Sequence, residues 1–279
     1  MRVVRIRGLL VWFAIVLAVV WSLAPLAWGV LTTFKTGTQV YDNEWVPWLQ
    51  FDPSLRNWHS LFRLPVLREA LVTSTIVATA VATGSVALAA PAMYSIARMG
   101  WTGRWQRGLL LAIISQRIMP PVIFITPFLL LSTYFHLRDT IPGLVIVDIA
   151  FMLPLAAIVS YSGYSAVHPE LIESAHLDGA SAVRAFWQIA SPLARSALAA
   201  AWVLCLAFTW NEWLYADFMR FNNLNTMPVA LIAVVGGGGG GNVPGAMARA
   251  MAMMVVPMIA GLASQRFIAS GLSMGAVKG

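Results

Sequence analysis

The chain has 279 residues, of which 59% are hydrophobic and only 10% are charged. Its mean hydropathy of +0.76 excludes an ordinary soluble domain and is typical of membrane proteins. The net charge of +7 would suggest nucleic-acid binding in a soluble protein, but in a membrane protein it reflects arginines retained at the cytoplasmic surface.

Apolar segments near the length that crosses a bilayer, roughly 20 residues, recur along the chain. The first follows Arg2, Arg5 and Arg7 and is long enough to span, so we interpret it as a helix rather than a cleaved signal. Long continuous runs favour helices over the short alternating strands of a barrel. The sequence thus predicts an all-α polytopic membrane protein, one domain over residues 1–279, with six transmembrane helices at about 9–31, 70–96, 109–135, 143–161, 197–214 and 246–262.

Lysines and arginines are unevenly distributed over the connecting segments of this six-helix count. Most of them fall on the side that holds both termini and residues 165–195, which predicts that this side is cytoplasmic. The opposite side receives the long segment Lys35–Leu67, whose Trp45, Trp48 and Trp58 are expected at the membrane interface.

The segment Glu173–Pro192, ESAHLDGASAVRAFWQIASP, is polar and helix-forming within an apolar chain. Pro169 suits the first position of a short helix, Gly179 offers the left-handed conformation that ends it, and Ser181 can cap a second helix. We expect Pro192 to break that second helix. The second helix carries the apolar residues Val183, Phe186, Trp187 and Ile189. Either the protein's own membrane domain or a partner must cover them.

The spacing within this segment resembles the signature E-A-A-x3-G-x9-I-x-L-P of permease subunits of binding-protein-dependent ABC importers. The positions that carry the resemblance are Glu173, Ser174, Ala175, Asp178, Gly179, Ala180, Ile189 and Pro192. Ser174 and Ser191 depart from the usual alanine and leucine, and we expect Ser191 to weaken packing locally. The resemblance implies the fold of type I importer permeases, in which residues 165–195 form a cytoplasmic coupling loop seated in a separate ATPase.

Further stretches are similar to the carbohydrate branch of this family, the MalG-like subunits of sugar importers. They include Trp210-Asn211-Glu212-Trp213 and the tail from Gln265 to Gly279. The resemblance implies a bacterial or archaeal cytoplasmic membrane, a second MalF-like permease subunit as heterodimer partner, two ATPase copies and an extracytoplasmic sugar-binding protein. A permease for a non-sugar solute and an ion-coupled secondary transporter remain alternatives, although we find no internal repeat of the kind that secondary transporters contain.

No phosphate-binding G-x-x-x-x-G-K-[ST] motif is found, so ATP and Mg²⁺ are expected on the partner ATPase and no cofactor on this chain. The glycine run ends at Asn242 rather than at a lysine. We expect this run either to be a flexible connector or, as the family resemblance implies, to form a loop that faces the binding protein. Its residues are Gly236, Gly237, Gly238, Gly239, Gly240 and Gly241.

Ionisable residues within spans are costly and therefore mark candidate functional positions. We list four candidates for the translocation path: Arg117, Asn211, Glu212 and Tyr215. For Asp148, Glu212 and Arg249 we expect interfacial solvation or mutual pairing. The methionine cluster near Met251 indicates adaptable packing rather than a metal path, because no histidine or cysteine cluster accompanies it. No catalytic group of nucleophile, base and orienting residue is found, so no enzymatic activity is expected.

Overall fold

The computed structural model describes residues 2–42, 44–98, 103–235 and 242–275, and in these ranges the chain forms helices and no strand. The predicted all-α fold is confirmed. The chain divides into two compact units, Met1–Arg68 with Ala230–Met254, and Glu69–Val229 with Val255–Gly279. Each unit is described by itself.

The first unit contains a long apolar helix and a short amphipathic one. Its elements are α1 (Arg2–Thr33), η1 (Gly37–Val40), α2 (Arg56–Arg63), the end of α12 (Met227–Val235) and the start of α13 (Val243–Gly275). The α1 helix packs closely on α13, because a Cβ at Gly29 would lie 2.9 Å from Cε of Met251. Most of the α1 side chains between Leu10 and Val30 are exposed, as expected for a helix that lipid or another subunit covers.

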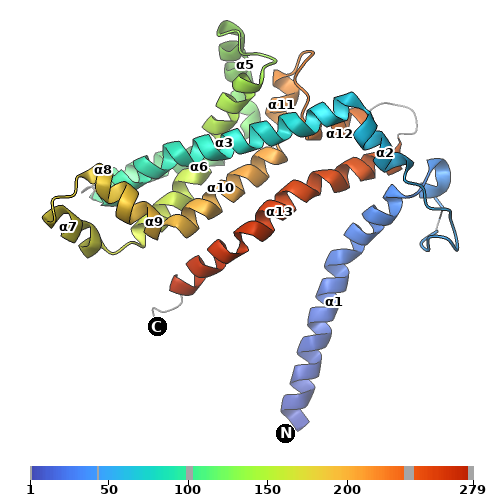
Figure 1. Cartoon of the computed structure of the whole chain (residues 1–279), viewed down its shortest axis with the longest axis horizontal. Coiled ribbons are helices and arrows are strands. Elements are labelled where there is room, and N and C mark those ends of the chain that lie inside the picture. Colours follow the sequence, from blue (N-terminus) through green and yellow to red (C-terminus); the bar gives the residue numbers. More distant parts are fainter. Residues whose placement is uncertain (1, 43, 99–102, 236–241, 276–279) are drawn as a thin grey trace. The chain divides into compact units, whose positions relative to one another are not determined.

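The second unit holds the hydrophobic core, to which α3, α6 and α10 contribute most. Its elements are α3 (Pro65–Arg98), α4 (Gly103–Ile118), η2 (Pro121–Phe124), α5 (Ile125–Tyr134), α6 (Ile141–Ser165), α7 (Pro169–Leu177), α8 (Ala182–Ala185), the π-helical turn η3 (Phe186–Ala190), α9 (Ser191–Leu193), α10 (Arg195–Trp210) and α11 (Leu214–Met219). Helices α6 and α10 touch so closely that a Cβ at Gly163 would lie 2.4 Å from Cβ of Ala197. The short helices α7 to α9 gather at one end of this pair (Figure 1).

Four helices in the described ranges are long and apolar enough to cross a membrane, or up to six if each of two bent pairs is one span. The predicted count of six therefore stays a prediction. The third predicted span, 109–135, is not one straight helix: α4 ends at Ile118, and the helical segment from Pro121 to Tyr134 departs at 95°. Pro120 and Pro121 explain this break, since proline lacks the N–H that continues a helix.

Candidate functional site

The coupling loop begins with a helix whose two ends follow the sequence prediction. Pro169 occupies the first turn of α7, after His168 in extended conformation. At the other end Gly179 has φ of +79° and donates its N–H to the His176 carbonyl at 3.0 Å, while the Ala180 N–H bonds the Ala175 carbonyl at 2.9 Å. These two bonds form a Schellman motif, and no atom lies within 4 Å of a Cβ built at Gly179. The backbone conformation, not crowding, requires glycine here.

The second helix of the loop starts as predicted and ends differently. The Ser181 hydroxyl accepts the Arg184 N–H at 3.3 Å and so caps α8. Helical structure then continues through the π-helical turn Phe186–Ala190 and through Pro192 to Leu193. The second helix does not break at Pro192 as predicted but continues one residue further, to Leu193. The chain bends by 77° only after Leu193.

The apolar face of this second helix is divided between cover and exposure. Phe186 is buried and Ile189 half-buried within the chain, whereas Val183 and Trp187 are 68% and 66% exposed. Leu177, at the tip of α7, is 89% exposed. Of the positions that carry the family resemblance, Ala175 is buried, Ala180 and Ile189 are half-buried, and the signature residues that remain exposed are Glu173, Ser174, Asp178, Gly179 and Pro192.

The base of the coupling loop is an aromatic cluster that the sequence analysis did not find. The Phe186 ring lies 5.3 Å from the ring of Tyr94 in α3 and 6.0 Å from that of Tyr164 in α6. Tyr164 is fully buried, and its hydroxyl lies 3.0 Å from Oγ of Ser191. Ser191 thus supplies the partner of a buried hydroxyl, which leucine could not do, and the expectation that it weakens local packing stays a prediction.

The translocation-path candidates have structural roles in the second unit. The Glu212 carboxylate accepts the N–H groups of Tyr215 at 2.8 Å and Ala216 at 3.1 Å, and so caps α11. Tyr215 is buried, and its hydroxyl donates to the Pro121 carbonyl at 2.9 Å, which satisfies a group freed by the α4–α5 break. Asn211 donates to the Ala207 carbonyl at 2.8 Å.

Arg117, the fourth candidate, lies apart from this capping arrangement. Its guanidinium stands 5.4 Å from the centre of the Phe208 ring, and both side chains are exposed. Asp148 in α6 is 1% exposed, and its Oδ1 has no hydrogen-bond partner within its own unit. Interfacial solvation, one of the two expectations for Asp148, is thus wrong. Arg249, in the first unit, is 7% exposed.

At the far end of α6 from the coupling loop, an acidic side chain joins two connecting segments. Asp139, which has φ of +61°, accepts four backbone N–H groups at 2.9 Å each, those of residues 221–224. Burial alone would raise the pKa of this carboxyl, but the four N–H groups outweigh it and hold the pKa well below its usual range. Arg138 covers the Phe221 ring at 5.7 Å.

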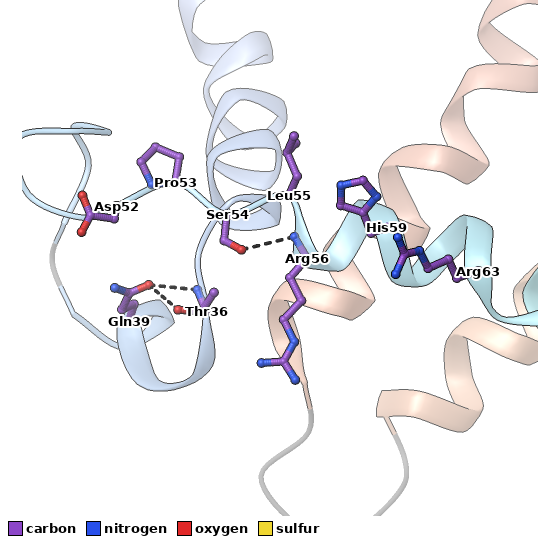
Figure 2. Close-up of a pocket in the computed structure, with 9 residues that line it drawn as sticks. All are labelled: Thr36, Gln39, Asp52, Pro53, Ser54, Leu55, Arg56, His59 and Arg63. Atoms are coloured by element: carbon purple, nitrogen blue, oxygen red, sulfur yellow. Dashed lines mark hydrogen bonds between the residues drawn. The ribbon is translucent and has the colours of Figure 1, made fainter.

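The first unit contains an open cleft of about 700 Å³ that the sequence analysis also missed. Arg56, His59 and Arg63 of α2 face it, with Thr36 and Gln39 on the other side (Figure 2). Helix α2 is held against the end of α1, because the Asn57 amide donates to the carbonyls of Thr33 and Lys35 at 2.9 and 3.0 Å. The basic residues recur at i, i+3 and i+7, a spacing that is visible in the sequence and marks one helix face. Trp58, expected as an interface anchor, is half-buried and donates to the Thr33 hydroxyl at 3.0 Å.

Comparison with known families decides the identity of the chain. Residues 93–273 match the family described as "Binding-protein-dependent transport system inner membrane component". The chain belongs to this family of permeases. The match includes the whole coupling loop, so the resemblance inferred from the sequence is confirmed. The six residues 236–241, proposed to face the binding protein, fall outside the residues that the structure describes.

Individual relatives cover nearly the whole permease. It is 33% identical over 268 residues to "Probable ABC transporter permease protein y4oR" of Sinorhizobium fredii, covering 95% of this chain and 94% of the relative. It is 30% identical to "Trehalose transport system permease protein SugB" of Mycobacterium tuberculosis, with 94% and 95% covered. A chain of a bacterial ABC transporter that imports the acidic polysaccharide alginate has the same fold, with a TM-score of 0.74, 18% identity, and 96% and 98% covered.

Proposed function

We propose that this permease forms half of the path by which a sugar or oligosaccharide enters the cell, driven by ATP hydrolysis on a separate subunit. The trehalose permease, identical at 30% of positions over nearly its whole length, supports a sugar rather than another solute. Family membership also favours a binding-protein-dependent importer over an ion-coupled transporter.

The exposed bend of the coupling loop is the observation that carries the proposal. Leu177, Val183 and Trp187 expose large apolar side chains on the same short segment that carries the exposed carboxylates of Glu173 and Asp178. Exposed apolar groups of this size, rimmed by polar ones, mark protein contacts. The base beneath them is buried and hydrogen-bonded, so a force on the bend reaches the spans instead of deforming the loop. In our proposal a cytoplasmic ATPase covers this surface.

The remaining partners follow from the same scheme. A second, MalF-like permease subunit completes the path, two ATPase copies bind ATP and Mg²⁺, and an extracytoplasmic binding protein delivers the sugar. Both termini and the coupling loop lie in the cytoplasm of a bacterium or archaeon. ATP-dependent closure of the ATPase pair then shifts the permease between its inward-open and outward-open states. Asn211, Glu212, Tyr215 and Arg117 remain candidates for the path, and Gly236–Gly241 for the contact with the binding protein.

Purification of the permease with its co-expressed neighbouring subunits tests this proposal. We expect an ATPase and a second permease subunit to copurify, and ATP hydrolysis in proteoliposomes to rise when the binding protein and trehalose are added. Glu173→Ala should lower this stimulation or release the ATPase while membrane insertion survives. Stimulation by phosphate or an amino acid in place of all sugars tested would contradict the substrate class, and a wild-type chain without any ATPase would contradict the mechanism.

A further inference from the structure

The end of α3 makes a dense set of hydrogen bonds with the entrance of the coupling loop. Arg98, in the last turn of α3, donates Nε and Nη2 to the Tyr164 carbonyl at 2.9 and 2.8 Å. Nη2 also donates to the Ser165 carbonyl at 2.7 Å and to the Val167 carbonyl. One guanidinium thus satisfies three carbonyls where α6 ends. Charge-assisted bonds at the negative end of a helix are among the stronger contacts in proteins.

A second contact from α3 lies one turn earlier, on the same face. Tyr94 precedes Arg98 by four residues, so both side chains project from one side of the helix. The Tyr94 ring lies 5.6 Å from the Tyr164 ring and 5.3 Å from the Phe186 ring. Tyr94 is itself buried. Helix α3 therefore holds both the segment that enters the loop and the second helix within it.

These contacts matter because of how the three spans are connected. Helix α6 leads into the coupling loop through the chain, and α10 leads out of it after the 77° bend. Helix α3 ends at Arg98 and is not next to the loop in the sequence. The helices α4, α5 and α6 lie between them. Any movement that the loop imparts to α3 must pass through noncovalent contacts, of which the Arg98 guanidinium makes the most directional.

We propose that Arg98 is a positioning residue that transmits movement of the coupling loop to α3. This inference rests on the proposed function, in which an ATPase moves the loop. When the loop shifts, the ends of α6 and α3 move together, because the Arg98 guanidinium is hydrogen-bonded to three carbonyls at the end of α6. Without it, α6 and α10 still follow the loop through the chain, while α3 is left to the aromatic contacts of Tyr94. Lysine offers one point charge without the planar fork and should transmit the movement only in part.

The test compares the response of two spans to nucleotide in the assembled transporter. Spin labels are attached singly to cysteines introduced for Leu88 in α3 and for Leu204 in α10, which are 56% and 39% exposed. The only native cysteine, Cys205, is fully buried and leaves these sites selective for the label. Label mobility is recorded with and without ATP plus vanadate, in the wild-type background, in Arg98→Gln and in Arg98→Lys.

In the wild type we expect both labels to respond to nucleotide. In Arg98→Gln the α3 label should lose its response while the α10 label keeps it, and Arg98→Lys should restore part of the α3 response. Arg107→Gln is the matched control, since Arg107 is exposed in α4, has no hydrogen bond or ion pair in the described part of the chain, and carries the same charge. Both labels should respond in this control.

A full nucleotide response of the α3 label in Arg98→Gln would overturn the inference. Where Arg98→Gln fails to assemble with the ATPase, Arg98→Lys decides: a reduced α3 response beside an intact α10 response supports the inference, and two intact responses overturn it. Failure of the proposed function looks different, because then neither label responds in the wild type.

Discussion

At the scale of single residues, the structure gives polar side chains precise tasks at the ends of helices. Ser191 pairs with the buried Tyr164 hydroxyl, Glu212 caps α11, and Asp139 binds four N–H groups of the segment 221–224. Each contact gives a hydrogen-bond partner to a polar group that would otherwise be unpaired in the interior or at a helix end. The partners of Ser191 and Asp139 come from distant segments and could not be predicted from the sequence, whereas those of Glu212 lie three and four residues further along the chain.

The Tyr164–Ser191 bond gives a prediction for stability. Ser191→Ala leaves the buried tyrosine hydroxyl without a partner and should cost about 1–3 kcal/mol, because an unpaired buried donor loses its full solvation. Tyr164→Phe combined with Ser191→Ala removes both partners and should recover most of that loss. Thermal unfolding in detergent of wild type, Ser191→Ala, Tyr164→Phe and the double variant measures this cycle. Additive losses in the double variant would show that the two hydroxyls do not interact.

Asp139 gives a prediction for pH dependence. Its pKa is lower in the folded chain than in the unfolded one, so its contribution to stability is present above about pH 4, the usual carboxyl pKa, and is lost as pH falls further. Asp139→Asn keeps a residue that tolerates positive φ but removes the charge. At pH 7 the Tm of this variant should lie a few degrees below that of wild type, the scale expected for hydrogen bonds to a charged group. The difference should shrink below pH 4, and a constant difference across pH would contradict the assignment.

At the scale of elements, the coupling loop is the part that sequence reasoning recovers best. Pro169 and Gly179 act through their backbone conformation and Ser181 through a hydroxyl that binds an N–H three residues away, so the effects of all three can be read from the local sequence. The π-helical turn at Phe186–Ala190 and the bend after Leu193 could not be predicted in this way, since they depend on packing against α3 and α6. The break between α4 and α5 lies between these cases. Its two prolines are visible in the sequence, but the 95° angle is not.

The left-handed turn at Gly179 gives a prediction for this element. Gly179→Ala adds no clash, because the space around its Cβ is open, yet it forces a positive φ that should cost about 1–2 kcal/mol. The bend should shift, and sugar moved per ATP hydrolysed should fall while the chain still inserts and assembles. Transport and hydrolysis are measured together in proteoliposomes.

Gly108→Ala is the matched control for this substitution. Gly108 lies within α4, where space around the Cβ is equally open and no positive φ is needed. Alanine should keep the same coupling ratio here and favour the helix slightly. Equal coupling in both variants would show that the conformation of Gly179 is not needed for transmission.

At the scale of the whole molecule, composition predicts a membrane protein, and the length of the apolar runs predicts an all-α fold. A chain with 59% hydrophobic residues can satisfy its backbone in a bilayer only as helices or a closed barrel, and its long apolar runs leave helices. What composition cannot give is which noncovalent contacts join the spans. The sequence does not show which groups Arg98 binds, whereas in the structure its guanidinium is hydrogen-bonded to three carbonyls at the end of α6.

The central claim is that the bend of residues 165–195 is the surface on which an ATPase acts from the cytoplasm. Site-specific photo-crosslinking with benzoylphenylalanine tests it most directly. One probe replaces Leu177, which is 89% exposed at the bend. The other replaces Tyr134, which is 77% exposed at the end of α5, before the start of α6, whereas the coupling loop follows the end of α6. In intact cells that express the whole transporter, Leu177 should capture the ATPase subunit and Tyr134 should not. Capture of the binding protein at Leu177, or of the ATPase at Tyr134, would contradict the account.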